Sequence, residues 1–197
     1  MRFMGSLASL FSSIWPERPG LWAFGFAALY WAIWQIMLVM PESLTPWQDR
    51  IHLVYLPAFV RALAVVIAGL AGVLGIFVGT LCVSLFTIGD PLEMAVSQGM
   101  ASALAPLLGY AIAWLMLGHR PGPSVHGLIL VGLLAALFNA MTHALSWQGF
   151  AELDEIPFST LSLMMLGDVM GVIVGFAVFR LFVGVLARLF HNTKSTV

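Results

Sequence analysis

The sequence predicts an all-α integral membrane protein, a bundle of about six transmembrane helices with a short N-terminal interfacial helix. Of its 197 residues, 61% are hydrophobic and only 9% are charged, and the mean hydropathy is +1.00. A soluble domain carries roughly a quarter charged residues, so this chain lacks the polar side chains that a water-exposed surface requires. Its apolar segments are continuous, which favours helices over the alternating strands of a β-barrel.

Six apolar segments are long enough to cross a bilayer as helices. They are Leu21–Met40, Leu53–Gly69, Gly72–Ile88, Glu93–Leu117, Ser124–Leu145 and Phe158–Ala187. Breaks rich in Gly and Pro separate them, since both residue types interrupt regular helices. The predicted transmembrane domain therefore covers residues 21–187, and its second and third spans share a very short turn.

Two short segments flank this domain. Residues 1–20 place Phe3, Leu7, Leu10 and Ile14 at helical spacing with serines around them. This pattern is typical of a helix that lies on the inner membrane surface, and a loosely ordered leader is the alternative. Residues 188–197 are predicted to be a cytoplasmic tail.

Basic residues gather on one side of the predicted topology. With the N-terminus in the cytoplasm, the outer loops contain Arg50 as their only basic residue. The inner segments contain Arg2, Arg18, Arg120, Arg188 and Lys194. Because the Lys and Arg bias sets orientation, we expect both termini in the cytoplasm.

Small residues recur at four-residue steps in three of the predicted spans. They are Gly75 and Gly79 in the third, Ala101, Ala105 and Gly109 in the fourth, and Gly167, Gly171 and Gly175 in the sixth. Such stripes allow helix backbones to approach closely in a membrane. They therefore predict helix packing rather than a ligand site.

Two charged residues, Arg61 and Asp168, lie deep within the predicted spans. At 1.5 Å per residue they lie ~12 Å and ~15 Å from the outer edge of their helices. Charges inside a membrane are costly and usually pair or line a cavity, so we predict an intramembrane Arg61–Asp168 ion pair. The pair either fixes helix register alone, or a ligand, a proton or a partner residue competes for one member. If the second span begins at Pro57, Arg61 lies one turn into its helix and faces an external vestibule.

Further polar residues predict a pocket near this pair. Asn139 and His143 share one face of the fifth span because they are four residues apart, and with Pro57 they form the predicted polar pocket. His52 lies at a similar depth to His143, but two histidines without a third ligand are a weak metal signal. We therefore predict no metal and no cofactor.

Two segments resemble a known family of membrane sensors. The run from Tyr55 to Ala64, YLPAFVRALA, resembles the W-P-P-A-G helix of MASE1 domains, and MLGDVMG at Met165–Gly171 resembles their W-L-G-D-x-x-G motif. Ala95–Leu117 resembles the small-residue helix of the same family. MASE1 domains are multi-span N-terminal sensors of bacterial histidine kinases and diguanylate cyclases. The resemblance implies a location in the bacterial inner membrane and a sensing role, here without an output domain.

The sequence contains no motif that predicts catalysis. There is no Gly-rich phosphate loop and no Cys/His nucleophile pair, and the net charge of −1 offers no basic footprint for nucleic acid. We therefore expect a non-enzymatic sensor or accessory subunit that acts through another integral membrane protein. Aromatic residues of the first span, among them Trp31 and Trp34, are expected to contribute to that contact. The alternative is the substrate-binding component of a vitamin-type uptake transporter.

Overall fold

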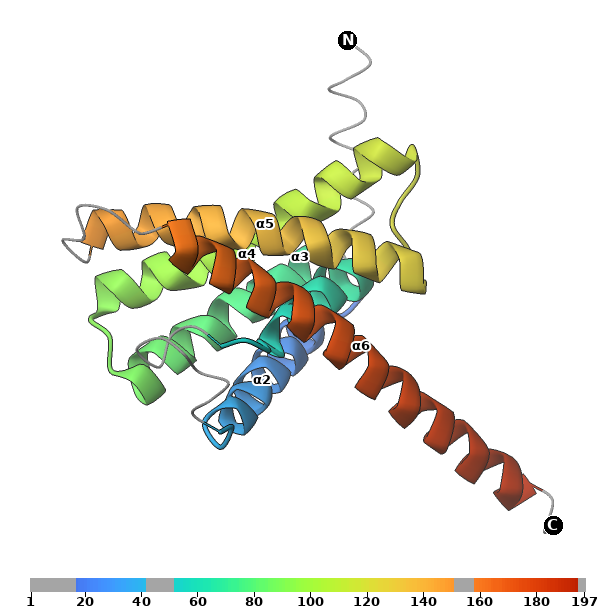
Figure 1. The fold of residues 1–197 in the computed structure, drawn as a ribbon. Coiled ribbons are helices and arrows are strands. Elements are labelled where there is room, and N and C mark those ends of the chain that lie inside the picture. The colour runs from blue at the N-terminus through green and yellow to red at the C-terminus, as the bar shows by residue number, and fades with distance from the viewer. Residues whose placement is uncertain (1–16, 42–51, 151–157, 195–197) are drawn as a thin grey trace.

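The computed structural model describes residues 17–41, 52–150 and 158–194, and every regular element in these ranges is helical (Figure 1). The elements are α2 (Pro19–Met37), α3 (Pro57–Cys82), the π-helical segment η2 (Val83–Ile88), α4 (Leu92–Leu117), α5 (Val125–Phe150) and α6 (Phe158–Lys194). Within these ranges, five helical stretches are long and apolar enough to cross a membrane. The all-α class is therefore confirmed, whereas the helix predicted in residues 1–20 lies almost entirely outside the described residues.

The predicted count of six spans is not confirmed, because the second and third predicted spans form one helical stretch, Pro57–Ile88. This stretch is interrupted at Gly69, whose φ of 54° and ψ of −130° are not helical. A Cβ on Gly72 would be only 2.2 Å from the carbonyl oxygen of Ala64. Residues eight apart in a straight helix are about 12 Å apart along the axis, so the chain folds back at Gly69. Glycine populates positive φ without steric cost, which explains its presence at this bend.

The first half of α3 begins at Pro57 rather than at Leu53. Residues 53–56 are a non-helical lead-in, and Pro57 occupies the first turn of the helix, where a missing backbone N–H has no cost. Arg61 consequently lies one turn into α3. Arg61 is nevertheless buried and is not among the residues that line the cavity described below, so the vestibule expected beside it is not observed among the described residues.

The small-residue stripes lie where neighbouring backbones come together. A Cβ on Gly75 would be 2.5 Å from the carbonyl oxygen of Ala23 in α2, and one on Gly109 would be 2.7 Å from the backbone nitrogen of Ala135 in α5. The remaining members follow the same pattern: Gly79 lies against α2, Ala101 and Ala105 are buried in α4, and Gly167, Gly171 and Gly175 lie against residues 52–59. These contacts fix the helices that surround the candidate site.

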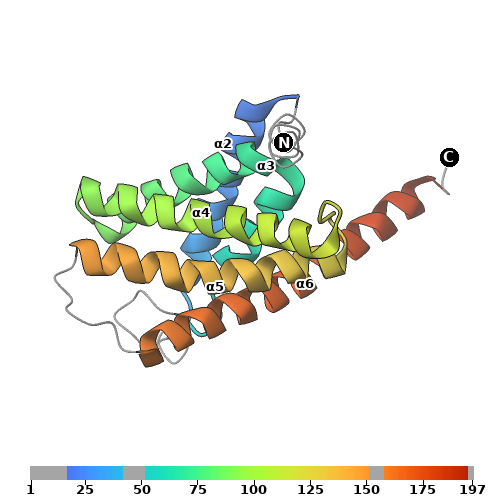
Figure 2. The same cartoon turned by 90° about the horizontal axis from the view of Figure 1, so that it is seen from above.

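The helices surround α3, which packs against α2, α4, α5 and α6. α4 and α5 lie side by side in both views (Figures 1 and 2). The N-terminal half of α6 packs on α5 and α3, whereas its C-terminal half projects away from the other helices (Figure 2). All residues from 177 to 185 are exposed.

The aromatic residues of α2 divide between the core and the surface. Tyr30 and Trp34 are buried in a cluster with residues of α3, whereas Trp22, Phe24 and Trp31 are exposed. Of the two tryptophans expected at a partner contact, only Trp31 is therefore accessible to a partner. Trp34 instead faces the interior of the protein.

Candidate functional site

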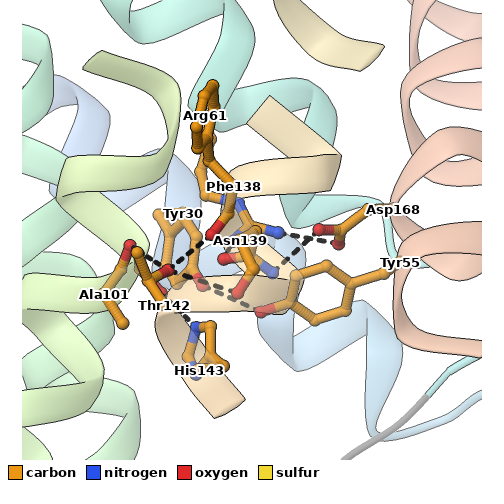
Figure 3. Close-up of polar contacts among 10 residues, drawn as sticks. Tyr30, Tyr55, Arg61, Ala101, Phe138, Asn139, Thr142, His143 and Asp168 are labelled. Atoms are coloured by element: carbon orange, nitrogen blue, oxygen red, sulfur yellow. Dashed lines mark hydrogen bonds and ion pairs between the residues drawn. The ribbon is translucent and has the colours of Figure 1, made fainter. Parts of the chain in front are cut away.

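A buried triangle of polar side chains joins three helices near the centre of the bundle (Figure 3). Arg61 of α3 donates from Nη2 to Asp168 Oδ1 of α6 over 2.8 Å. Asn139 of α5 accepts a hydrogen bond from Arg61 Nη1 and donates from Nδ2 to Asp168 Oδ2 over 2.8 Å. The three side chains are at most 3% exposed. The structure thus brings together the two charges singled out in the sequence and adds Asn139 as their shared partner.

The lead-in before α3 positions Arg61 for this contact. It runs along the glycine stripe of α6, where the Tyr55 backbone N–H donates to the Gly167 carbonyl oxygen over 2.9 Å. A Cβ on Gly167 or Gly171 would be 1.9 Å from the carbonyl oxygen of His52 or Tyr55, respectively. Only glycine permits this approach, and it brings the first turn of α3 next to Asp168.

Aromatic side chains cover one side of the triangle. The Arg61 Cζ atom lies 5.1 Å from the ring centroid of Tyr55, within the range of a cation–π contact. The Tyr55 and Tyr30 hydroxyl groups are 2.9 Å apart and share a hydrogen bond. Burial, reinforced by Tyr30, raises the pKa of Tyr55 well above its usual value, so its phenol stays protonated and neutral. The buried Arg61 guanidinium therefore has both a carboxylate partner and an aromatic ring against it, and the Asp168 carboxylate accepts a hydrogen bond at each oxygen.

A second polar layer links α4 to α5. Ser102 Oγ lies 3.3 Å from His143 Nε2, and Ser97 Oγ lies 2.7 Å from Ser146 Oγ. Thr142 Oγ1 donates within α5 to the Phe138 carbonyl oxygen over 2.9 Å and also lies 3.3 Å from the Ala101 carbonyl oxygen of α4. The sequence alone does not pair Ser102 with His143, because the two residues are 41 positions apart and no motif marks them. Their hydrogen bond holds the two helices in register beside the triangle.

These residues surround a cavity with about 640 Å³ of empty space, its open mouth included. Every helical element contributes to its lining, which consists of Tyr30, Trp34, His52, Tyr55, Thr80, Val83, Ser84, Ile88, Asp90, Gln98, Ser102, Asn139, His143, Met164 and Asp168. Most of them are buried, whereas Ile88 is exposed and Asp90 is half-buried. The mouth therefore lies beside the turn between η2 and α4.

The π-helical segment η2 shapes this mouth. It ends at Gly89, whose φ is 83°, and the backbone N–H groups of Gly89 and Asp90 both donate to the Ser84 carbonyl oxygen over 2.9 Å. Ser84 Oγ donates to Asp90 Oδ2 over 2.6 Å. π-Helical turns occur frequently at functional sites, and this one places both Ser84 and Asp90 on the cavity wall.

The predicted polar pocket is in part the observed cavity. Asn139 and His143 line it, whereas Pro57 is buried at the start of α3 and is not among the lining residues. His52 lines the cavity as well. Within the described ranges, no group of three or more His, Cys, Asp or Glu residues has the geometry to hold a metal ion.

Comparisons with known proteins give no relative for this chain: no family model, no curated protein and no solved structure matches it. The resemblance of residues 55–64 and 165–171 to MASE1 domains therefore stays a prediction. The cavity and the buried triangle are consequently the features from which a function can be inferred.

Proposed function

We propose that this protein is a non-enzymatic membrane sensor or accessory subunit that binds a small molecule in the cavity and acts through a partner membrane protein. The cavity is the observation that supports this proposal. Binding sites are typically concave and mostly apolar, with a few convergent polar groups. Here Trp34, Tyr30 and Val83 supply apolar wall, and Asn139 and Asp168, the two members of the triangle that line the cavity, supply polar wall.

The composition of the lining supports a signalling role. Because α2, α3, η2, α4, α5 and α6 all contribute side chains, a ligand that binds one arrangement of the helices more tightly shifts the whole bundle toward that arrangement. A partner that contacts any outer helix then responds to ligand occupancy.

The exposed aromatic residues of α2 support a partner contact there. Trp31 is 46% exposed and Phe24 is 73% exposed. We expect Phe24→Ala with Trp31→Ala to reduce the amount of partner that co-purifies from native membranes several-fold, because aromatic side chains dominate interface energies. Leu133→Ala with Leu137→Ala is the matched control on α5, where both residues are 42–44% exposed. Equal recovery of the partner with both double variants would contradict this role of α2.

The same cavity also supports the alternative function, the substrate-binding component of an uptake transporter. The co-purified partner distinguishes the two proposals. Kinase, cyclase or respiratory subunits are expected for the sensor or accessory subunit, and ATPase subunits for the transporter component. A partner-free monomer that transports or converts a substrate in liposomes would contradict the sensor proposal.

We further propose that the protein lies in the bacterial inner membrane with both termini in the cytoplasm, which places the cavity mouth outside. Asp90 and Arg120 flank opposite ends of the 26-residue helix α4, so they are expected on opposite sides. In a Cys82→Ser background, an impermeant thiol reagent should label Ile88→Cys and Asp154→Cys in intact cells. It should label Arg120→Cys only after permeabilisation. Labelling of position 120 in intact cells would reverse the orientation.

A further inference from the structure

The buried carboxylate of the cavity lining, Asp168, is already compensated by its partners in the triangle. Both carboxylate oxygens of Asp168 accept hydrogen bonds, one from Arg61 and one from Asn139. The Arg61 guanidinium additionally bonds Asn139 and lies over the Tyr55 ring. Asp90, the other acidic residue of the lining, lies at the half-buried mouth and accepts a hydrogen bond from Ser84. A charged ligand in the interior would therefore compete with the triangle for its partners.

Two buried donors in the lining point to the chemistry of the ligand. Trp34 Nε1 and Thr80 Oγ1 have no hydrogen-bond partner among the described residues, and their side chains are only 5% and 7% exposed. Folded proteins rarely leave such groups unpaired. The indole N–H of Trp34 only donates, whereas the Thr80 hydroxyl both donates and accepts. A complementary ligand therefore offers a hydrogen-bond acceptor to Trp34.

From these two observations we propose that the cavity binds a small uncharged molecule with a carbonyl-type acceptor, which bonds the Trp34 N–H and the Thr80 hydroxyl. This inference rests on the proposed function, because it names the ligand class of the same cavity. A net charge on the ligand is disfavoured because a charge without a counter-ion is poorly solvated in a protein interior. An uncharged carbonyl compound satisfies both donors. It also leaves intact the Arg61–Asn139–Asp168 triangle, whose contacts Figure 3 shows.

Three probes of equal size and different charge test the proposal. Acetamide is neutral, acetate is an anion and acetamidinium is a cation, and all three have the same number of non-hydrogen atoms. The full-length protein, labelled with ¹⁵N-tryptophan in detergent micelles, is titrated with each probe while the indole N–H resonances are recorded. Trp34 lies in the cavity wall and Trp31 is exposed on the same helix, so the Trp31 resonance reports non-specific effects.

We expect acetamide to shift the Trp34 resonance with a Kd on the order of millimolar, as its small size allows. Acetate and acetamidinium should bind at least tenfold more weakly. Thr80→Val, which replaces the hydroxyl with a methyl group of similar size, should weaken acetamide binding about tenfold, as expected for one lost hydrogen bond. Thr87→Val in η2, outside the cavity lining, is the matched control and should leave the acetamide Kd unchanged.

The possible failures are distinguishable. Equal or tighter binding of acetate or acetamidinium at Trp34 would overturn the ligand class while keeping the cavity as the binding site. Saturating acetamide without a shift specific to Trp34 would overturn the inference itself. The proposed function fails on a different measurement, the transport or conversion of a substrate by a partner-free monomer in liposomes.

Discussion

Asp168→Asn is expected to lower the free energy of unfolding by about 3–5 kcal/mol, the loss typical when one member of a buried ion pair is removed. The substitution keeps the shape of the side chain and a hydrogen-bond acceptor, but it leaves the Arg61 guanidinium without its counter-ion. Both side chains are at most 3% exposed, so the remaining guanidinium charge is poorly solvated in the variant. Thermal or denaturant unfolding of both proteins in the same detergent measures the effect.

Asp90→Asn is the matched control, because it is the same chemical change at the half-buried mouth of the cavity. Asn at this position keeps an acceptor for the Ser84 hydroxyl, and the site is partly open to water, so the loss should be about 0–1 kcal/mol, as for ion pairs near the surface. Similar losses for Asp168→Asn and Asp90→Asn would contradict a special role for the buried triangle.

Exchange of the two charges tests whether they interact directly. The single variants Arg61→Asp and Asp168→Arg each place two like charges together. The double variant that combines them should recover at least half of the stability that either single variant loses. Asn139 favours this recovery, since its side-chain amide donates to the carboxylate and accepts from the guanidinium. When the two charges are exchanged, a 180° rotation of this amide group restores both hydrogen bonds. Additive losses in the double variant would mean that Arg61 and Asp168 do not stabilise each other.

Gly171→Ala is expected to destabilise the protein by about 1–3 kcal/mol or more, the usual range for an overpacked core. The new Cβ would lie 1.9 Å from the Tyr55 carbonyl oxygen and 2.4 Å from its carbonyl carbon. These are backbone atoms, so the lead-in must move away from α6, and His52, Tyr55 and Arg61 move with it. We therefore also expect the Trp34 resonance to lose its response to acetamide.

Gly184→Ala is the control within the same helix. Nothing lies within 4 Å of the Cβ that it would add, and Ala is more favourable than Gly inside a helix by about 0.5–1 kcal/mol. The same substitution in α6 should therefore have opposite effects at positions 171 and 184. A loss of stability at both positions would point to a general intolerance of α6 rather than to the contact with Tyr55.

The helical bundle follows closely from the sequence because apolar length alone determines where a helix can cross a membrane. The predicted start and end of the fourth span, Glu93 and Leu117, differ from α4 by one residue at most. The Arg61–Asp168 pair was also predictable, because opposite charges within apolar helices usually pair, and their Nη2 and Oδ1 atoms are 2.8 Å apart. The depth estimated for Arg61 was wrong, since α3 begins at Pro57 rather than at Leu53.

The lateral arrangement of the site was less predictable. The partners of Ser102 and Trp34 lie on helices far away in the chain. Residue spacing within one helix does not predict which other helix packs against it. The bend at Gly69 has a similar origin: the Gly69–Gly72 segment predicts a turn between two spans, but not the close contact of Gly72 with Ala64. The sequence likewise does not identify the unpaired donors of Trp34 and Thr80, because Trp and Thr are common residues in apolar helices.

The projecting half of α6 is a long extension of a helix that also lines the cavity. Asp168 lies in the cavity wall, and the same uninterrupted helix continues to Lys194 (Figure 2). At 1.5 Å per residue, these 26 positions correspond to an arm of about 39 Å, so a tilt of roughly 5° at Asp168 displaces the far end by about 3 Å. If the proposed ligand shifts α6 at Asp168 by less than an ångström, the geometry of the helix would therefore enlarge that shift several-fold at its far end.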